Sequence, residues 1–407
     1  MPDKNGASVQ KTGVAVVGGG PAGLTAAITL AAAGIETVLA GKRPGPTDNR
    51  TTALFAGSVT ALETLGVWGR CTEHAAPLKV MRIVDNTGRL LRAPEARFDA
   101  GEIDLETFGY NIENRHLVAA LEARAREFPA LRVIETQVQA VETGADRVTI
   151  RLDDNRAVSA PLAIGADGRR SLCRAAAGIA LDERSYPQSA LTVCFAHSRP
   201  HHDISTEFHT RSGPFTTVPL PGLRSSLVWV LDPDMAERVA ALDDAELSTE
   251  IERRSHSILG KVVVESGRGL FPLSVATARP FGAHRIALIG EAAHVIPPIG
   301  AQGLNLGLRD AATIGKLVIA AERDGIDPGS ASVLSHYDAL RRADVGSRTL
   351  AIDLLNRSLL SDFLPMQGAR GLGLYLIGRI GPLRRALMRE GVNPAAAQPH
   401  LTRGETL

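Results

Sequence analysis

Residues 13–40 alternate between apolar runs and glycines in an order typical of a strand, helix, strand unit. Gly13–Val17 is an uninterrupted apolar run, as in a buried parallel strand. Pro21–Ala33 is rich in alanine and is followed by Gly34, which predicts a helix with a glycine at its C-terminal end. Thr37–Ala40 predicts a second strand. The pattern therefore indicates an α/β domain with a parallel sheet.

Three glycines lie in the turn between the first predicted strand and the helix, with the spacing Gly18-x-Gly20-x-x-Gly23. In such a unit the first glycine allows a tight turn, the second lets the backbone approach a pyrophosphate, and the third lets helix and strand pack closely. Pro21 and Ala22 open the helix, whose N-terminus favours negative charge. The turn predicts a dinucleotide site.

One residue expected in such a site is missing. A carboxylate usually ends the second strand and binds the adenosine ribose, but Gly41 occupies that position. Lys42 and Arg43 follow it, and basic residues there favour a 2′-phosphate. This position alone therefore leaves NADP open as the tightly held dinucleotide.

Two later regions have different patterns. Residues 181–280 contain β-rich runs such as Ser189–Phe195 and Ser225–Val230, separated by polar and Pro-Gly turns. Together with Lys79–Arg92 they predict a mixed sheet packed against the nucleotide domain. Residues 288–310 then read as an apolar strand, an acidic turn, a proline- and glycine-bent loop and a helix. That order suits a bound cofactor better than plain scaffold.

Composition narrows the class of protein. The chain has 407 residues, of which 44% are hydrophobic and 22% charged, so it can build a large core and more than one domain. A net charge of +1 gives no bulk attraction for nucleic acid. Cys71, Cys173 and Cys194 are widely separated, which predicts neither a metal site nor disulfides.

Several ordered blocks resemble one family. Ala163–Arg174 resembles the Asp-Gly motif of FAD-dependent aromatic monooxygenases of the para-hydroxybenzoate hydroxylase class, and residues 288–310 resemble their Gly-Asp motif. Within that class the chain is most similar to the ubiquinone-biosynthesis hydroxylases, from about residue 13 to 350. The blocks that carry this resemblance are Asp48–Leu54, Leu65–Trp68, Gly109–Leu117 and Gly300–Gly307.

The resemblance implies a Rossmann-like FAD-binding domain of the glutathione-reductase type, a mixed β-sheet substrate domain and C-terminal helices. We expect the chain to pass between the two domains more than once. The expected segments are 10–75, 106–180 and 273–350 for FAD, 76–105 and 181–272 for the substrate domain, and 351–407 for the C-terminal helical region.

The resemblance also assigns residues to the site. Glu291 takes the place of the acid that hydrogen-bonds the ribityl chain, with one methylene more than the family's aspartate. Pro298 and Gly300 would position the flavin ring at the catalytic centre. The expected FAD-binding residues are Gly18, Gly20, Pro21, Ala22, Gly23, Arg50, Arg115, Asp167, Glu291, Pro298, Gly300, Gln302, Gly303, Leu304 and Asn305. The expected substrate-facing residues are Phe215, Val218, Pro219 and Leu220, with a sheet core as the alternative for about half of them.

The implied reaction is hydroxylation of the aromatic ring of a prenylated phenol in ubiquinone biosynthesis. NAD(P)H would bind transiently and reduce FAD, O₂ would form a C4a-hydroperoxyflavin, and one oxygen atom would pass to the ring. A flavin reductase or halogenase of the same fold is an alternative. A flavin-holding accessory protein of a biosynthetic complex is another, because Gly41 and Glu291 depart from the family pattern.

The C-terminal region is apolar and basic. Met366–Met388 combines leucines and isoleucines with several arginines, which is typical of a helix at a membrane interface. A helix packed on the flavin domain and an oligomer contact are the alternatives. We expect a cytoplasmic protein, with peripheral attachment to the inner membrane, membership of a ubiquinone-biosynthesis complex and a homo-oligomer left open.

Overall fold

The computed structural model describes residues 8–42, 45, 50–88, 94–298, 300–360, 379–392 and 399–405, without the side chains of 351, 352 and 355–360. Arg43, Asp48, Asn49, Ile299 and residues 366–378 of the expected C-terminal helix lie outside this part of the chain. Among the described residues the strands form four sheets.

The strand, helix, strand unit predicted at the N-terminus is confirmed. Strand β2 (Val14–Val17) leads into helix α1 (Pro21–Ala32), and β3 (Thr37–Ala40) pairs with β2 in parallel. All eight strand residues are buried. Gly34 follows the helix with a φ of +80°, a conformation that glycine adopts without strain.

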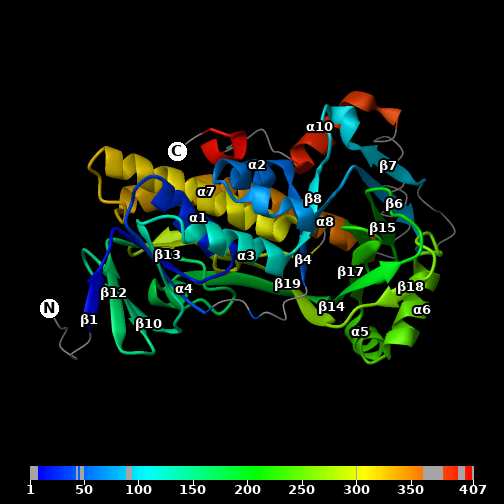
Figure 1. The fold of residues 1–407 in the computed structure, drawn as a ribbon, viewed down its shortest axis with the longest axis horizontal. Coiled ribbons are helices and arrows are strands. Elements are labelled where there is room, and N and C mark those ends of the chain that lie inside the picture. The colour runs from blue at the N-terminus through cyan, green and yellow to red at the C-terminus, as the bar shows by residue number, and fades with distance from the viewer. Residues whose placement is uncertain are drawn as a thin grey trace.

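A six-stranded, mostly parallel sheet extends this unit. Its order is β20 (Gly282–Ala283), β21 (Ile286–Leu288), β13 (Leu162–Gly165), β2, β3 and β9 (Leu131–Ile134). Only β20 is antiparallel to its neighbour. Helix α1 packs against α3 (Asn114–Ala125) and α7 (Gln302–Arg323), and α7 packs against α8 (Ala331–Leu360). Figure 1 shows α7 and α1 running side by side across this part of the molecule.

A nine-stranded mixed sheet forms the other large layer, on the right in Figure 1. Helices α5 (Pro233–Ala240) and α6 (Asp244–Arg254) pack over a core around Phe195, Phe215 and Trp229. The order of the sheet is β22 (His294–Val295), β19 (Gly269–Arg279), β14 (Ala180–His197), β17 (Arg224–Leu231), β16 (Pro214–Leu220), β15 (Ile204–His209), β6 (Val80–Asp85) and β7 (Ala96–Asp99), with β18 (Val262–Val264) beside β14.

Two smaller sheets complete the fold. One has the order β4 (Thr51–Phe55), β8 (Gly109–Glu113) and β5 (Ala75–Pro77), and β5 and β8 contact β16 of the large mixed sheet. The other has the order β1 (Ser8–Lys11), β12 (Arg156–Ala160), β11 (Val148–Leu152) and β10 (Val138–Thr143).

Short helices connect these layers. Helix α2 (Ala56–Thr64) follows β4 directly, and α4 (Leu172–Ala176) follows β13 after a loop. Helix α10 (Gly381–Val392) lies above β7 in Figure 1, against the short turn Ala100–Ile103. In the described residues we find no helix with the length and apolar content needed to cross a membrane.

The structure confirms the predicted fold class: a Rossmann-like α/β part, a mixed sheet and further helices toward the C-terminus. The segment boundaries stay a prediction. One detail bears on them: β19 runs without interruption across the expected boundary between residues 272 and 273. Strands β14 and β19 pair with each other over much of their length within the nine-stranded sheet.

Candidate active site

The glycine turn before α1 has the close contacts that its spacing predicts. A Cβ atom on Gly18 would lie 2.2 Å from the carbonyl oxygen of Ala166, and one on Gly23 would lie 2.0 Å from that of Gly18. Gly18 also has a φ of +117°. By contrast, a Cβ on Gly20 would meet no described heavy atom within 4 Å. The backbone is therefore tightly packed at Gly18 and Gly23 but open at Gly20, where a phosphate can approach.

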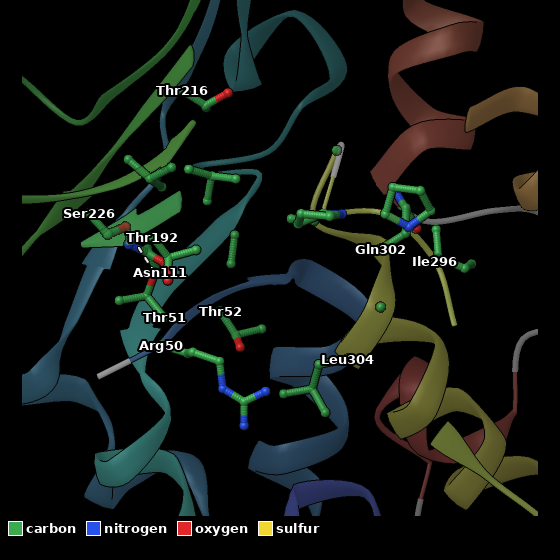
Figure 2. A pocket seen from close by; sticks show the side chains of 18 of the residues that line it. Arg50, Thr51, Thr52, Asn111, Thr192, Thr216, Ser226, Ile296, Gln302 and Leu304 are labelled. Atoms are coloured by element: carbon green, nitrogen blue, oxygen red, sulfur yellow. Dashed lines mark hydrogen bonds between the residues drawn. The ribbon is translucent and has the colours of Figure 1, made fainter. Parts of the chain in front are cut away.

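A cavity of about 780 Å³ begins at this turn and extends to the nine-stranded sheet. This size is within the usual range for sites of small molecules and cofactors. Figure 2 shows its walls: Thr192, Thr216 and Ser226 project from the sheet, Gln302 and Leu304 from the start of α7, and Arg50 and Thr52 from the segment between them. The predicted residues that line it are Gly20, Pro21, Ala22, Arg50, Val218, Glu291, Pro298, Gly300, Gln302, Gly303 and Leu304.

Within the described residues, neither α1 nor α7 has a side-chain cap at its N-terminus. Both helix starts line the same cavity through Gly20, Gln302 and Gly303. The first N–H groups of a helix have no partner within it, and the helix dipole adds partial positive charge there. Two uncapped helix starts facing one cavity suit an elongated, negatively charged ligand. The residues present therefore fit a flavin dinucleotide.

Gly41 packs too closely to carry a side chain. Its φ is +156°, and a Cβ would lie 3.0 Å from Cα of Gly18. The missing ribose carboxylate thus reflects a close contact between two backbone segments. Glu122 and Glu135 line a small hollow beside Gly19 and Gly41.

Asn305 does not line the cavity but fixes the loop that does. Its side-chain oxygen accepts hydrogen bonds from Phe55 N (2.9 Å) and Ser58 Oγ (2.7 Å). Its nitrogen donates to the carbonyl oxygens of Ala53 (2.8 Å) and Ala301 (2.7 Å). Ala301 precedes α7 with a φ of +52°. The amide therefore holds a left-handed residue at the helix start and ties α7 to β4 and α2.

Asp167 is likewise engaged with its own loop. Its carboxylate accepts hydrogen bonds from Ser171 Oγ (2.6 Å) and Cys173 N (3.1 Å), while the flanking residues Ala166 and Gly168 line the cavity. Asp167 therefore shapes the loop below the cavity wall.

Glu291 lies in the cavity wall and is half exposed, with Oε1 3.5 Å from Nη2 of Arg169. A pair at this distance and exposure holds the side chain only weakly. Glu291 therefore remains able to turn toward a ligand. Arg115, by contrast, lies outside the described lining, and its Nη2 donates to Oε1 of Glu113 at 2.8 Å.

A buried carboxylate supports the acidic turn from behind. Asp310 Oδ2 accepts from Gly290 N (2.9 Å) and lies 2.6 Å from Nε2 of His294, a cavity-lining residue. Asp310 Oδ1 accepts from Nε of Arg341 at 2.6 Å. Burial opposes ionisation of Asp310, but the attraction of His294 and Arg341 outweighs it and lowers the pKa of this carboxyl to about 2.

A chain of ion pairs and hydrogen bonds runs from Asp310 to the start of α7. Asp344 accepts hydrogen bonds from Nη1 of Arg341 (2.7 Å) and from Arg348 (3.1 Å). Arg348 in turn donates to Oε1 of Gln302 (2.8 Å). Helix α8 therefore holds both the acidic turn and the start of α7. Arg341 is 31 residues from Asp310 in the chain, and no motif in the sequence indicated this network.

Of the four residues expected to face substrate, Val218 lines the cavity and the other three are buried. Phe215 is buried on the opposite face of β16, edge-on to Trp229 with ring centroids 5.3 Å apart. Pro219 and Leu220 are buried and do not line the cavity within the described residues. Successive strand residues face opposite sides, so Thr216 and Val218 lie on the face of β16 opposite Phe215 and line the cavity.

Sequence reasoning missed a polar group in this wall. Asn111 Nδ2 donates to Ser226 Oγ at 3.2 Å and to the carbonyl oxygen of Pro219 at 2.9 Å, and Thr51 Oγ1 donates to Ser226 Oγ at 2.9 Å. Thr51, Asn111 and Ser226 all line the cavity. Thr51 and Asn111 stand in blocks that carried the family resemblance, so a signal for them existed.

The thiol of Cys194 also lies in the cavity wall. Burial, with a smaller effect from the charge of Glu113, raises the pKa of this thiol to about 12. All three cysteines are buried. In the described residues no group of three or more His, Cys, Asp or Glu side chains could hold a metal ion.

The cavity is bordered by a glycine turn on a parallel sheet, by the start of a second helix and by a mixed sheet. This arrangement defines the FAD-dependent monooxygenase class. The sequence matches the FAD binding domain family over residues 11–350. Among solved structures, p-nitrophenol 4-monooxygenase PnpA from Pseudomonas putida DLL-E4 has a TM-score of 0.78 at 21% identity, covering 96% of this chain and 100% of that chain. At this identity the likeness shows the fold.

Relatives in sequence narrow the family. The ubiquinone hydroxylase UbiL of Rhodospirillum rubrum is 35% identical, over 97% of this chain and 93% of its own length. The 3-demethoxyubiquinol 3-hydroxylase of Escherichia coli is 30% identical, over 93% of this chain and 98% of its own length. The chain belongs to the FAD-dependent ubiquinone hydroxylase family.

Proposed function

We propose that this protein hydroxylates the aromatic ring of a prenylated phenol in ubiquinone biosynthesis, with FAD as cofactor, NAD(P)H as transient reductant and O₂ as the oxygen source. The observation that carries the proposal is the single cavity that joins the glycine turn of α1, the start of α7 and the inner face of the mixed sheet. The names of the two relatives, both aligned over nearly the whole chain, supply the pathway.

FAD would supply the redox chemistry, and the chain would supply binding, orientation and shielding from water. Gly20 and the N-terminus of α1 would receive the pyrophosphate. The N–H groups of Gln302, Gly303 and Leu304 at the start of α7 would lie toward the ring and stabilise negative charge there. Pro298 and Gly300 would shape the loop beside the ring without taking part in proton transfer.

The remaining predicted residues divide into two groups. Arg50 and Glu291 line the cavity, which supports direct contact with the cofactor: the guanidinium with phosphate or ring, and the carboxylate with ribityl hydroxyls. Asp167 and Asn305 use their polar atoms within the protein, so we propose that they position the loops on either side. Arg115 lies farther from the cavity, and we propose that it acts on the site through Glu113.

The substrate ring would lie between the flavin-side loop and the sheet. Thr51, Asn111 and Ser226 form a hydrogen-bonded group there, and their hydroxyl and amide groups are suited to a phenol hydroxyl. Around them the wall is mostly apolar, with Val218, Leu227 and other aliphatic side chains. Such a wall excludes water from the site of oxygen transfer.

The test is oxygen transfer by the purified holoprotein. A farnesylphenol should stimulate NAD(P)H oxidation and gain an oxygen atom from isotope-labelled O₂, detected by mass spectrometry. A reductase would oxidise NAD(P)H without oxygenating the ring, and a halogenase would require halide. An accessory protein would do neither, and that result would overturn the proposal.

We also propose that α10 contacts an anionic membrane surface. Ile380, just before the helix, and Leu383 on it are exposed at 44% and 43%, near the exposed Arg385 and Arg389. Apolar side chains flanked by arginines suit the boundary between headgroups and acyl chains. Flotation with vesicles of phosphatidylglycerol should recover the protein, and vesicles of phosphatidylcholine should recover less. Equal or absent recovery would contradict the contact.

A further inference from the structure

Helix α10 forms part of the cavity wall although it is far in sequence from the flavin segments. Met388 and Val392 are its buried residues, and both line the cavity. Across from them lie Met81 of β6 and Phe98 of β7, which belong to the same apolar cluster. The described lining at this end is largely apolar, with Leu78, Met81, Ile83, Phe98, Phe108 and Met388, and it also includes Arg82 of β6 and Glu207 of β15.

Ion pairs fix α10 in this place. Arg384 makes a two-pronged contact with Glu102, at 2.5 and 2.7 Å, and its guanidinium lies 4.5 Å from the centroid of the Phe98 ring. The hydrogen bonds from Arg384 lower the pKa of Glu102. At the other end of the helix, Arg348 donates to the carbonyl oxygen of Glu390 at 3.3 Å. The helix therefore stands as a fixed wall in the described structure.

The cavity meets solvent at this wall. Leu387 lines the cavity and is nevertheless 47% exposed, so its side chain borders the opening. Two further charged lining residues, Arg169 and Glu291, belong to the opposite, dinucleotide end.

We propose that the apolar passage between α10 and the β6–β7 pair binds the isoprenoid tail of the substrate and that Leu387 borders its exit. This inference rests on the proposed function, which supplies a phenol with such a tail. The ring would sit beside Asn111 and Ser226, and the tail would run past Phe98 and Met388 to the opening. Each methylene buried there adds to binding because it leaves water. A small phenol would occupy only the inner part of the cavity and leave the passage empty.

The experiment compares a tailed and a tailless ligand on matched variants of α10. Leu387→Trp narrows the opening, whereas Ala386→Trp places the same bulk on an exposed neighbour that does not line the cavity. Binding of ortho-farnesylphenol and of phenol to the FAD-loaded protein is measured by calorimetry, and KM is measured for each. Leu387→Trp should weaken farnesylphenol binding about tenfold, consistent with ordinary costs of overpacking, and leave phenol binding unchanged. Ala386→Trp should change neither.

A second variant tests the interior of the passage. Met388→Trp should weaken farnesylphenol binding at least as strongly, and circular dichroism verifies that the variant is folded. If Leu387→Trp changed the binding of both ligands equally, or of neither, the proposed tail-binding passage would be wrong. Equal affinity of the unmodified protein for farnesylphenol and for phenol would also contradict the proposal. Binding of farnesylphenol without oxygenation would instead count against the proposed function and leave the passage standing.

Discussion

The two walls of the cavity are built on different principles. On the flavin side, backbone atoms are in close contact at Gly18, Gly23 and Gly41, and polar groups such as Asn305 have partners within the protein. On the sheet side, the wall consists of side chains whose shape and polarity matter more than their backbone. The first wall tolerates few residue types and leaves a motif in the sequence. The residues of the second come from several strands far apart in the chain, so no single motif spans it, although Thr51 and Asn111 stand in blocks that carried the family resemblance.

The largest effect should come from adding one methyl group to the flavin-side wall. In Gly23→Ala the new Cβ would lie 2.0 Å from the carbonyl oxygen of Gly18, so the turn must open. We expect a loss of more than about 4 kcal/mol in the free energy of unfolding and no retained flavin. Urea unfolding and the absorbance of the purified protein measure both. Gly20→Ala, whose Cβ meets open space, is the control and should fold normally; equal stability of both variants would refute the distinction.

The next largest effect should come from Asp310→Asn, which leaves the Arg341 guanidinium buried without its ionic partner. We expect a loss of about 3–5 kcal/mol. Glu142→Gln, which breaks an exposed pair with Arg151, should cost less than about 1 kcal/mol in the same urea titration. Similar losses in the two variants would show that the buried network contributes no more to the free energy of unfolding than an exposed ion pair.

Asp310 also predicts a pH dependence. Its pKa is about 2 in the folded protein and about 3.9 in an unfolded chain, so folding favours the ionised form. The stabilisation is complete above pH about 4 and is lost as pH falls toward about 2. Unfolding midpoints measured across this range should fall less steeply in Asp310→Asn than in the parent. Parallel curves would contradict the assignment.

A pair of substitutions on β16 separates core from cavity wall. Phe215→Ala should cost about 3–4 kcal/mol, because the buried ring packs on Phe208 and Trp229, and should leave KM nearly unchanged. Val218→Ala should cost about 1 kcal/mol and raise KM, because this side chain faces the cavity. Thermal unfolding and steady-state kinetics distinguish the two patterns. The reverse pattern would mean that β16 presents its other face to substrate.

A smaller loss than those of Gly23→Ala, Asp310→Asn and Phe215→Ala should come from Asn305→Ala. It leaves Phe55 N and the carbonyl oxygens of Ala53 and Ala301 without their side-chain partner, for an expected loss of about 2–3 kcal/mol. Ser58→Ala removes one of the four hydrogen bonds and should cost about 1 kcal/mol. The flavin dissociation constant, measured by fluorescence, should rise only in Asn305→Ala. An equal rise in both would assign the effect to α2 instead of the loop.

The sequence was informative wherever one stretch of chain carries both structure and function. The βαβ unit and the α7 loop were predicted because each is local, and glycine is needed at fixed positions. The Asp310–Arg341 pair was not predicted, because its members come from different helices. On β16 the sequence shows that side chains alternate between two faces, but it does not show which face borders the cavity. Helices α5 and α6 cover one face of that sheet, and the other face borders the cavity. Because neither face is open to solvent, Phe215 and Val218 are both apolar and look equivalent in the sequence.

Cys194 has a consequence for the durability of the enzyme. With a pKa of about 12 its sulfur stays protonated at neutral pH, and the thiolate is the form that oxidants attack. If oxygen is activated in this cavity as proposed, the sulfur of Cys194 can border it without being oxidised over repeated turnovers. The same burial that shapes the wall also protects it from the enzyme's own chemistry.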